Sequence, residues 1–327
     1  MNPSQRTVAE VGEFALIRRA VAGRSQPDTT LLGPGDDAAI VRASDGRVAV
    51  STDMLVQGRH FRLDWSSPHD VGRKAVAQNA ADVFAMGARP TAFLVSLGCP
   101  PDTLASVVEG ISAGIGEAAE ALGAGVVGGD VVQADQVVVS VTVLGDLEGR
   151  AAVLRSGARV GDVVAVAGEL GRSAAGLALL SAGVESSAGA DHDNPLVAVH
   201  RVPSPPYHCA LAAVDGPGGR ATSMTDVSDG LLADLGHICE ESRVGMDLSG
   251  AALRADADLV AVAERIGVDP QDWVLTGGED HAFAGTFPAG TALPAGWTQI
   301  GLVRAGSGMS IDGTPVTGAV GWQSFSV

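Results

Sequence analysis

Cysteine, lysine and aromatic residues are scarce in this chain of 327 residues. Its three cysteines, Cys99, Cys209 and Cys239, form no CxxC pair, which excludes a disulfide framework and a thiolate zinc site. Phe, Trp and Tyr together number 12, too few for the aromatic platforms on which single-stranded nucleic acids stack. Lys74 is the only lysine beside 20 arginines. This usage suits a reducing compartment and argues against a nucleic-acid partner.

Long apolar runs and positive charge are also lacking. No apolar stretch reaches the length of a membrane span, and the N-terminal residues lack a basic segment followed by an apolar core. Acidic residues number 38 against 21 basic ones, a net charge of −17, which argues against a basic surface that binds phosphate backbones. We therefore expect a soluble cytoplasmic protein with no membrane partner.

Glycine, by contrast, is abundant, with 44 residues that separate β-rich runs from alanine-rich amphipathic stretches. This alternation predicts an α/β protein, and the length predicts about two domains. A Gly- and Arg-rich connection precedes a new hydrophobic strand, so we place the boundary between domains 1–148 and 149–327. The pattern predicts helices over 11–22, 68–86, 102–122, 174–182 and 230–241, and strands over 38–41, 48–51, 91–97, 137–147, 163–168 and 221–225.

Acidic residues recur beside glycines and at the ends of predicted strands. Each one alone fits an ordinary turn or helix N-cap. Their number favours a site for several hard divalent cations, which are held by carboxylates, hydroxyls and water. The segments are GPGDDAAI with Asp36 and Asp37, STDM with Ser51, Thr52 and Asp53, NAADVF with Asp82, VGGDV with Asp130, TDVSDG with Asp226 and Asp229, and TGGED with Glu279 and Asp280.

Familiar metal and nucleotide motifs are missing. The TDVSDG segment lacks the alternate-position ligands and final glutamate of an EF-hand loop. Lys74 does not follow a Walker A glycine loop, and the protein-kinase signatures and HExxH are absent. A nucleoside triphosphate would therefore have to be held through cations that the aspartates recruit.

Three other side chains are candidates for contacts with such a ligand. Arg155, in LRSGAR, can bind phosphate oxygens through its guanidinium, although a surface arginine is an equally good reading. His60 follows the STDM segment by a short loop and is a candidate substrate contact, or a structural histidine. Lys74 suggests a position on its helix that requires a compact ammonium, with chance as the alternative.

The order of these motifs resembles one family. The segments STDMLVQGRHF, KAVAQNAADVFAMGARP, VGGDVV, RSGARVGD, TDVSDGLLADLGHI and TGGED, and the final GWQSF, occur as in the thiamine-monophosphate kinases. The resemblance covers nearly the whole chain. Two positions depart from the family's pattern: Ala81 precedes Asp82 where a serine is usual, and His281 follows TGGED where a tyrosine is common.

The resemblance implies the two-domain α/β (α+β) fold of the aminoimidazole ribonucleotide synthetase-like superfamily. Its N-terminal domain binds ATP and magnesium and pairs its sheet across a homodimer, and its C-terminal α/β domain closes over nucleotide and substrate. By position, the implied magnesium ligands are Asp37, Ser51, Thr52, Asp53, Asp82, Asp130, Asp226 and Asp229; the ATP contacts are Gly129, Asp130, Arg155 and Ser228; and the thiamine phosphate contacts are His60, Glu279 and Trp322.

The implied reaction is transfer of the γ-phosphoryl group of ATP to thiamine monophosphate, the last step of thiamine diphosphate biosynthesis. No covalent nucleophile is required, and Asp53, Asp82 and Asp229 would act through several Mg²⁺ ions. Another ATP-dependent member of the superfamily, close to aminoimidazole ribonucleotide synthetase, is an alternative. A non-catalytic acidic cation-binding protein is a third reading. The chain has no cysteine before Cys99 and none at its end, which argues against selenophosphate synthetases and hydrogenase-maturation relatives.

Overall fold

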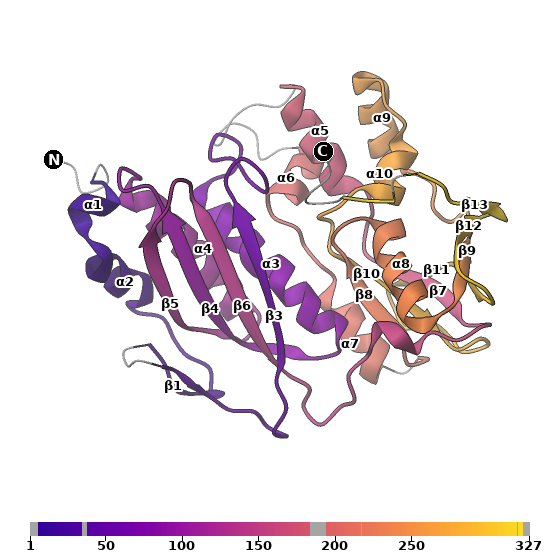
Figure 1. Cartoon of the computed structure of the whole chain (residues 1–327), viewed down its shortest axis with the longest axis horizontal. Helices are drawn as coiled ribbons and strands as arrows, with labels where there is room; N and C mark the ends of the chain where they lie inside the picture. Colours follow the sequence, from indigo (N-terminus) through magenta and orange to yellow (C-terminus); the bar gives the residue numbers. More distant parts are fainter. Residues whose placement is uncertain (1–5, 35–37, 184–193, 217, 319, 323–327) are drawn as a thin grey trace. The chain divides into compact units, whose positions relative to one another are not determined.

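The computed structural model describes all residues except 1–5, 35–37, 184–193, 217, 319 and 323–327 (Figure 1). Their contacts divide into two compact units, which we describe one at a time. The first unit lies within Met1–Val83 and Ala88–Gly149. The second lies within Phe84–Gly87, Arg150–Glu185 and Asp191–Val327.

The first unit is built on a four-stranded sheet with helices on one face (Figure 1). The strand order is β3-β6-β4-β5, and only β4 and β5 run parallel. Alternate residues of the central strand β6, among them Val139, Val141 and Val143, are buried on the helical face. The strands are β3 (Ala49–Val56), β4 (Arg89–Cys99), β5 (Gly125–Gln133) and β6 (Val138–Asp146), and the two long helices are α3 (Pro68–Ala85) and α4 (Ala105–Ala121).

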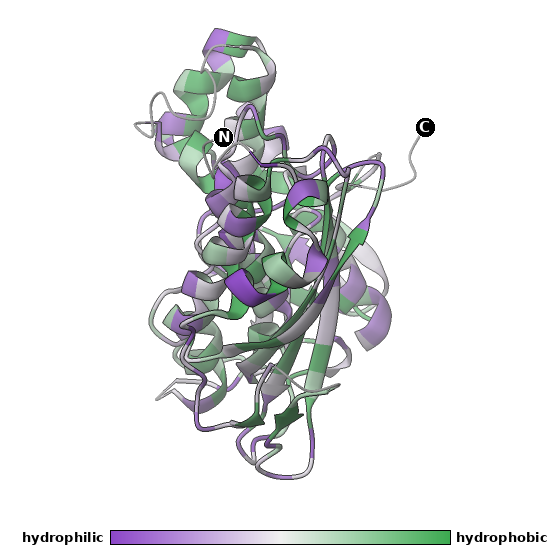
Figure 2. Ribbon diagram, turned by 90° about the vertical axis from the view of Figure 1, so that its left-hand side faces the viewer, coloured by the Kyte–Doolittle hydropathy of each residue, from purple (hydrophilic) through white to green (hydrophobic). Residues whose placement is uncertain are grey.

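Strand β3 shows how alternation sorts its side chains between the two faces. Leu55 is buried and Ser51 and Asp53 are half-buried, whereas Val50 and Met54 on the alternate positions are exposed. Figure 2 views this unit from the side and shows hydrophobic stretches along the strands. The expectation that the STDM segment ends a strand is wrong: it lies in the middle of β3, because the strand continues through Val56 against β6.

Helices α3 and α4 cross at two glycines. A methyl group on Gly72 would collide with the backbone carbonyl of Ile111, and one on Gly114 would collide with the backbone carbonyl of His69. The two helix backbones therefore touch directly, which fixes α3 relative to α4. The smaller elements of this unit are α1 (Val8–Val11), α2 (Glu13–Val21), β1 (Thr30–Leu32) and β2 (Ile40–Val41).

The second unit contains a seven-stranded, mostly antiparallel sheet in the order β13-β12-β9-β11-β7-β10-β8. Strands β8 and β10 are buried along their whole length, so they form the unit's core. Its strands are β7 (Val163–Ala167), β8 (Ser223–Val227), β9 (Gly245–Leu248), β10 (Ala282–Phe287), β11 (Trp297–Arg304), β12 (Gly308–Ile311) and β13 (Thr314–Pro315). Its helices are η2 (Arg155–Gly157), α5 (Arg172–Ser181), α6 (Pro195–Arg201), α7 (Tyr207–Asp215), α8 (Leu231–Ser242), α9 (Ala257–Ile266) and α10 (Pro270–Thr276).

Within the described ranges, no helix is both long enough and apolar enough to cross a bilayer. The mixed α/β fold in two parts that the sequence predicts is confirmed by both sheets and their helices.

Candidate functional site

Polar side chains of β3 and α3 meet in the first unit and form what we call the first cluster: Ser51, Asp53, Asn79 and Asp82. The Ser51 hydroxyl donates to Asp82 Oδ2 at 2.6 Å. The backbone N–H of Asp53 donates to Asn79 Oδ1 at 3.1 Å, and the Asn79 amide is held by the Ala75 carbonyl at 2.8 Å. The structure thus brings together three of the predicted metal ligands.

Asn79 is a member that the sequence interpretation did not select. Its side chain is buried, and it joins the backbone of β3 to helix α3. The signal that could have found it is its spacing: it precedes Asp82 by three residues, so both side chains lie on the same face of the helix.

Thr52 and Asp130 lie on the other face of the four-stranded sheet. Thr52 donates to the Val141 carbonyl at 3.1 Å and accepts from the Thr142 hydroxyl at 3.0 Å. Asp130 pairs with Ser96, and Ser96 lies in the same cross-strand row as Met54. Asp130 is therefore on the exposed face of the sheet. The side chains of Thr52 and Asp130 are therefore not brought into the first cluster.

The structure does not place Gly129 or Asp37 in the first cluster. A methyl group on Gly129 would collide with the Val95 carbonyl, so the close pairing of β5 with β4 requires glycine at that position. Asp37 lies outside the described residues. Both assignments remain predictions.

His60 lies in the tight turn that follows β3. Its Nδ1 accepts a hydrogen bond from the Val56 backbone N–H at 3.0 Å, which fixes the ring against the end of the strand. The Lys74 ammonium, on α3, donates to the His60 carbonyl at 3.1 Å. Lys74 is only 2% exposed, so the sole lysine of the chain holds the backbone that carries His60.

We expect Lys74→Arg to weaken both stability and activity. The longer, planar guanidinium does not fit a fully packed position, and overpacking costs about 1–3 kcal/mol. For the reaction that the resemblance implies, displacement of the His60 turn should raise the KM for thiamine monophosphate more than the KM for ATP. Thermal unfolding and steady-state kinetics measure both effects, with Lys74→Met as the control that keeps the length and removes the charge. A Lys74→Arg variant with full activity and normal metal dependence would contradict the requirement for a lysine at this position.

In the second unit, three segments lie backbone to backbone at what we call the second cluster: Asp226, Ser228, Asp229, Glu279 and Trp322. The Glu279 N–H donates to the Ser228 carbonyl at 2.7 Å, and the Trp322 N–H donates to the Asp229 carbonyl at 2.9 Å. The structure therefore gathers the remaining predicted site residues around the loop after β8, with the exception of Arg155.

Glycines and unusual backbone angles permit this contact. A methyl group on Gly278 would lie 2.6 Å from the Ser228 carbonyl oxygen, and one on Gly230 would lie 2.7 Å from the Thr276 carbonyl oxygen. Glu279 and His281 have φ of 66° and 53°, in the left-handed region that non-glycine residues rarely adopt. The hydrogen bond from the Glu279 N–H to the Ser228 carbonyl holds the loop in this conformation.

A buried carboxylate, Asp234 on α8, lies beneath the loop. Its Oδ2 accepts three backbone N–H bonds, from Ser228 at 3.0 Å and from Asp229 and Gly230 at 3.1 Å. Burial, with the neighbouring Asp226 and Asp229 carboxylates, raises the pKa of Asp234 to about 7. The sequence interpretation missed Asp234, because the three residues between it and the TDVSDG motif, Leu-Leu-Ala, mark an ordinary helix start.

His281 pairs with Asp226. Its Nδ1 lies 3.0 Å from Asp226 Oδ2, and both side chains are buried. His281, one of the two residues that depart from the pattern of the family this sequence resembles, thus touches a predicted metal ligand and fixes the orientation of that carboxylate.

Asp280 is also buried, but it faces the start of helix α5 and not the second cluster. It accepts the N–H groups of Gly171 at 2.6 Å and of Ser173 at 2.7 Å, two donors that the helix itself cannot satisfy. Burial raises the pKa of Asp280 to about 6. Its role in this motif is therefore to hold the helix N-terminus.

The pKa of Asp280 predicts a stability change with pH. Because its folded-state pKa, about 6, exceeds the unfolded value of about 3.9, the folded state binds its proton more tightly. The stability that this proton contributes, about 3 kcal/mol, is complete below pH 4 and lost as the pH rises through 6. Subtracting the unfolding free energy of Asp280→Asn from that of the wild type should give a curve that falls across this window. A flat difference would contradict the prediction, and the exposed Asp272→Asn serves as the control.

Arg155 lies away from the second cluster. Its backbone carbonyl accepts a hydrogen bond from Ser242 Oγ at 2.7 Å, and Ser242 is the last residue of α8. Ser228 and Asp229 lie just before the first residue of α8, at the opposite end of the helix. A helix of 12 residues is about 18 Å long. The exposed Arg155 guanidinium has no hydrogen-bond or ion-pair partner within the part of the chain that the structure describes. Its contact with ATP remains a prediction.

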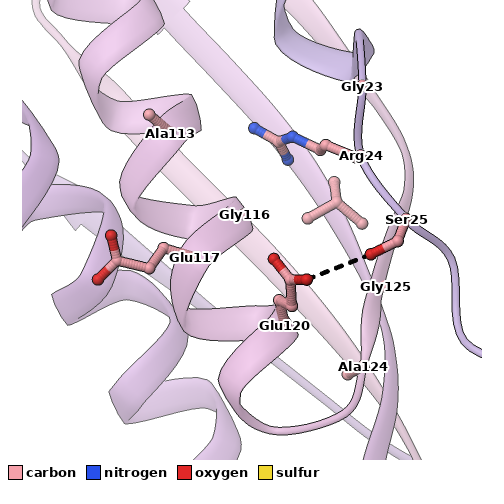
Figure 3. A pocket seen from close by; sticks show the side chains of 10 residues that line it. Gly23, Arg24, Ser25, Ala113, Gly116, Glu117, Glu120, Ala124 and Gly125 are labelled. Atoms are coloured by element: carbon pink, nitrogen blue, oxygen red, sulfur yellow. Dashed lines mark hydrogen bonds between the residues drawn. The ribbon is translucent and has the colours of Figure 1, made fainter.

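Two surface hollows of the first unit hold none of the predicted residues. One, of about 280 Å³, lies between α4 and β5 and the turn at Arg24 (Figure 3). Its charged groups are occupied: Arg24 donates to both oxygens of Ser112, and Ser25 donates to Glu120 at 3.3 Å. The other, of about 300 Å³, is lined by β2 and the turn after it, the starts of β3 and β4, and the end of β6. Neither resembles a prepared ligand site.

Apart from the Trp322 indole, the side chains of both clusters offer oxygens of carboxylates, hydroxyls and an amide. Among the residues with a described position, no three His, Cys, Asp or Glu side chains converge as a metal site. Each cluster can contribute one or two carboxylates to a cation whose other ligands come from elsewhere, which is how Mg²⁺ is usually bound.

Comparison with known proteins gives one consistent result. Residues 35–147 match the model of the AIR synthase related protein N-terminal domain, and residues 159–277 match that of its C-terminal domain. The chain is 58% identical to a thiamine-monophosphate kinase of Mycobacterium tuberculosis, over 98% of this chain and 93% of the relative. It is 39% identical to that of Corynebacterium glutamicum, over 98% and 95%.

The fold agrees with solved structures of such enzymes. The structure of AaThiL complexed with AMPPCP and TMP matches with a TM-score of 0.77 and 32% identity, over 97% of this chain and 98% of that one. A thiamine-monophosphate kinase from Stenotrophomonas maltophilia matches with a TM-score of 0.76 and 29% identity, over 92% and 95%. The two domain models and the identity over nearly the full length establish that this chain belongs to the family of thiamine-monophosphate kinases.

Proposed function

We propose that this chain transfers the γ-phosphoryl group of ATP to thiamine monophosphate and releases thiamine diphosphate and ADP. One observation carries the proposal: the oxygen ligands of the first and second clusters lie in a chain that matches relatives named thiamine-monophosphate kinase over nearly its full length. A homologous structure contains AMPPCP and TMP, a nucleotide analogue and the acceptor of this reaction.

The donor set fits magnesium. Asp53 and Asp82 supply carboxylates and Ser51 a hydroxyl in the first cluster; Asp226 and Asp229 supply carboxylates in the second. Hard oxygen donors suit Mg²⁺, which commonly takes one or two carboxylates together with phosphate oxygens and water. When bound, the metal would neutralise the phosphate charge that otherwise keeps the two anionic substrates apart.

The residues of this chain then need only bind and align the substrates. The second pKa of a phosphate monoester is near 6, so the attacking oxygen is already unprotonated at neutral pH. That oxygen forms a bond to the γ-phosphorus while the bond to the β–γ bridging oxygen breaks, and the electron pair leaves with ADP. His60, Glu279 and Trp322 would hold the thiamine phosphate and Ser228 the nucleotide, whereas Gly129, Asp130 and Arg155 are nucleotide contacts on the resemblance alone. No general base or covalent nucleophile is required.

The test is incubation with ATP, Mg²⁺ and thiamine monophosphate, followed by chromatography for thiamine diphosphate. We expect stoichiometric ADP and product, and no product when EDTA removes the metal. Absence of product across a range of metal and salt concentrations would remove the proposal. A phosphoprotein formed with ATP alone would contradict direct transfer while leaving the overall reaction in place.

We also propose that the enzyme is a cytoplasmic homodimer that pairs through the exposed face of the four-stranded sheet. Val50, Met54 and Val132 are each more than half exposed on this face, a cost that a partner would relieve. We expect Val132→Glu to sediment as a monomer, because it would place a charge in the contact. Val260→Glu, at an exposed position of α9, is the control. A wild-type monomer, or a Val132→Glu dimer of unchanged affinity, would contradict the proposal.

A further inference from the structure

The loop after β8 carries more of the second cluster than any other segment, and one side chain holds it. The carbonyls of Ser228 and Asp229 accept hydrogen bonds from the N–H groups of Glu279 and Trp322. The loop therefore also fixes the backbone positions of those two residues. The N–H groups of Ser228, Asp229 and Gly230 all point the other way, to one oxygen of Asp234.

Such an arrangement is unlike an ordinary helix N-cap. A capping residue precedes its helix and accepts one or two N–H bonds, whereas Asp234 lies within the first turn of α8 and accepts three from the preceding loop. Gly230, at φ 125°, supplies the turn that lets the loop fold over the carboxylate. Asp234 is 2% exposed, so in the intact protein its carboxylate, and not solvent, satisfies these three N–H groups.

We propose that Asp234 is the positioning residue of the second cluster: its carboxylate oxygen fixes the backbone of Ser228–Gly230 and thereby sets the direction of the Ser228 and Asp229 side chains. The role of the cluster in phosphoryl transfer rests on the proposed function above. The geometry of the loop does not, and it can be tested without any substrate.

Two substitutions separate geometry from charge. Asp234→Asn keeps an acceptor oxygen at the same distance from the backbone and removes the charge. Asp234→Glu keeps the charge and moves the acceptor by one methylene, about 1.5 Å. If the residue acts by positioning, Asn is the milder change; if it acts through its charge, Glu is. Glu241→Gln, an exposed acid on the same helix, is the matched control.

For the loop itself, amide hydrogen exchange gives the readout. We expect the amides of Ser228, Asp229 and Gly230 to exchange at least tenfold faster in Asp234→Glu and Asp234→Ala than in the wild type. In Asp234→Asn the increase should be smaller, and amides in the second half of α8 should not change. Equal exchange in all variants would overturn the proposal, whatever reaction the enzyme catalyses.

For activity, we expect kcat to fall by at least thirtyfold in Asp234→Glu, with the KM for ATP changed by less than fivefold. Asp234→Asn should keep at least a fifth of the wild-type kcat, and Glu241→Gln all of it. The reverse order, with Glu more active than Asn, would overturn the positioning role. A wild-type enzyme that makes no thiamine diphosphate would instead refute the proposed function, and the exchange measurement would still decide on Asp234.

Discussion

Asp53→Asn should abolish most of the turnover and leave the fold intact. The substitution keeps the size of the side chain and the backbone N–H bond to Asn79, but it replaces a carboxylate that we assign to the metal by a neutral amide. Loss of a metal contact is worth several kcal/mol in the transition state, so we expect kcat to fall by at least about a hundredfold.

The measurement is the steady-state rate of thiamine diphosphate formation at several Mg²⁺ concentrations, beside the melting temperature. The apparent affinity for Mg²⁺ should fall, and the melting temperature without ligands should move by only a few degrees. Asp82→Asn and Asp229→Asn should behave alike. Asp135→Asn, an exposed acid near the same sheet, should match the wild type. Unchanged rates in all three site variants would refute the metal assignment.

The long helices could be predicted because residues with a conformational reason mark their ends. Ser67-Pro68 begins α3 and Gly87, at φ 78°, follows its end; α4 ends shortly before Gly123, at φ 71°. Strands with continuous apolar runs, such as β6 and β7, were also predicted within a residue or two. In these segments local preference and burial agree.

Strands β3 and β5 were harder to predict because polar residues and glycines occupy positions where a strand normally has apolar core residues. In β3, Ser51 and Asp53 occupy the helix-facing side, so the apolar alternation fails and only its first half reads as a strand. In β5, the pair Gly128 and Gly129 suggests a turn. The close approach of the Val95 carbonyl, which only the folded sheet contains, is what requires glycine there.

The candidate site shows the same division. Motif order identified Asp82 and Ser51, which bond to each other, and gathered Ser228, Asp229 and Glu279. It could not tell that the Asp280 carboxylate accepts from the N-terminus of α5, or that the Glu279 carboxylate lies 3.5 Å from His200 Nδ1 while only its backbone N–H bonds to Ser228. Successive side chains in a loop with φ values of 66° and 53° follow no simple periodicity, so the direction of each one depends on the tertiary contacts.

Gly72→Ala should be among the most destabilising single-methyl changes in the protein. The added methyl would collide with the carbonyl oxygen of Ile111 and lie 2.7 Å from the backbone nitrogen of Ile115. Both obstacles are backbone atoms of α4, so they cannot rotate away and the two helices must separate. We expect a loss of about 3 kcal/mol or more in the free energy of unfolding, and a fall of about 10 °C in melting temperature.

The same substitution at Gly236, within α8, is the matched control, and its sign should be opposite. There the nearest atom to the added methyl is the end of the Met309 side chain, at 3.9 Å, so only the helix preference remains. Alanine in place of a helical glycine contributes about 0.5–1 kcal/mol. If Gly72→Ala melted like the wild type, α3 and α4 would not be in backbone contact. If the melting temperature of Gly72→Ala falls as expected, its kcat should fall as well. Helix α3 brings Asp82 to within 2.6 Å of the Ser51 hydroxyl, and a displaced helix cannot keep that hydrogen bond.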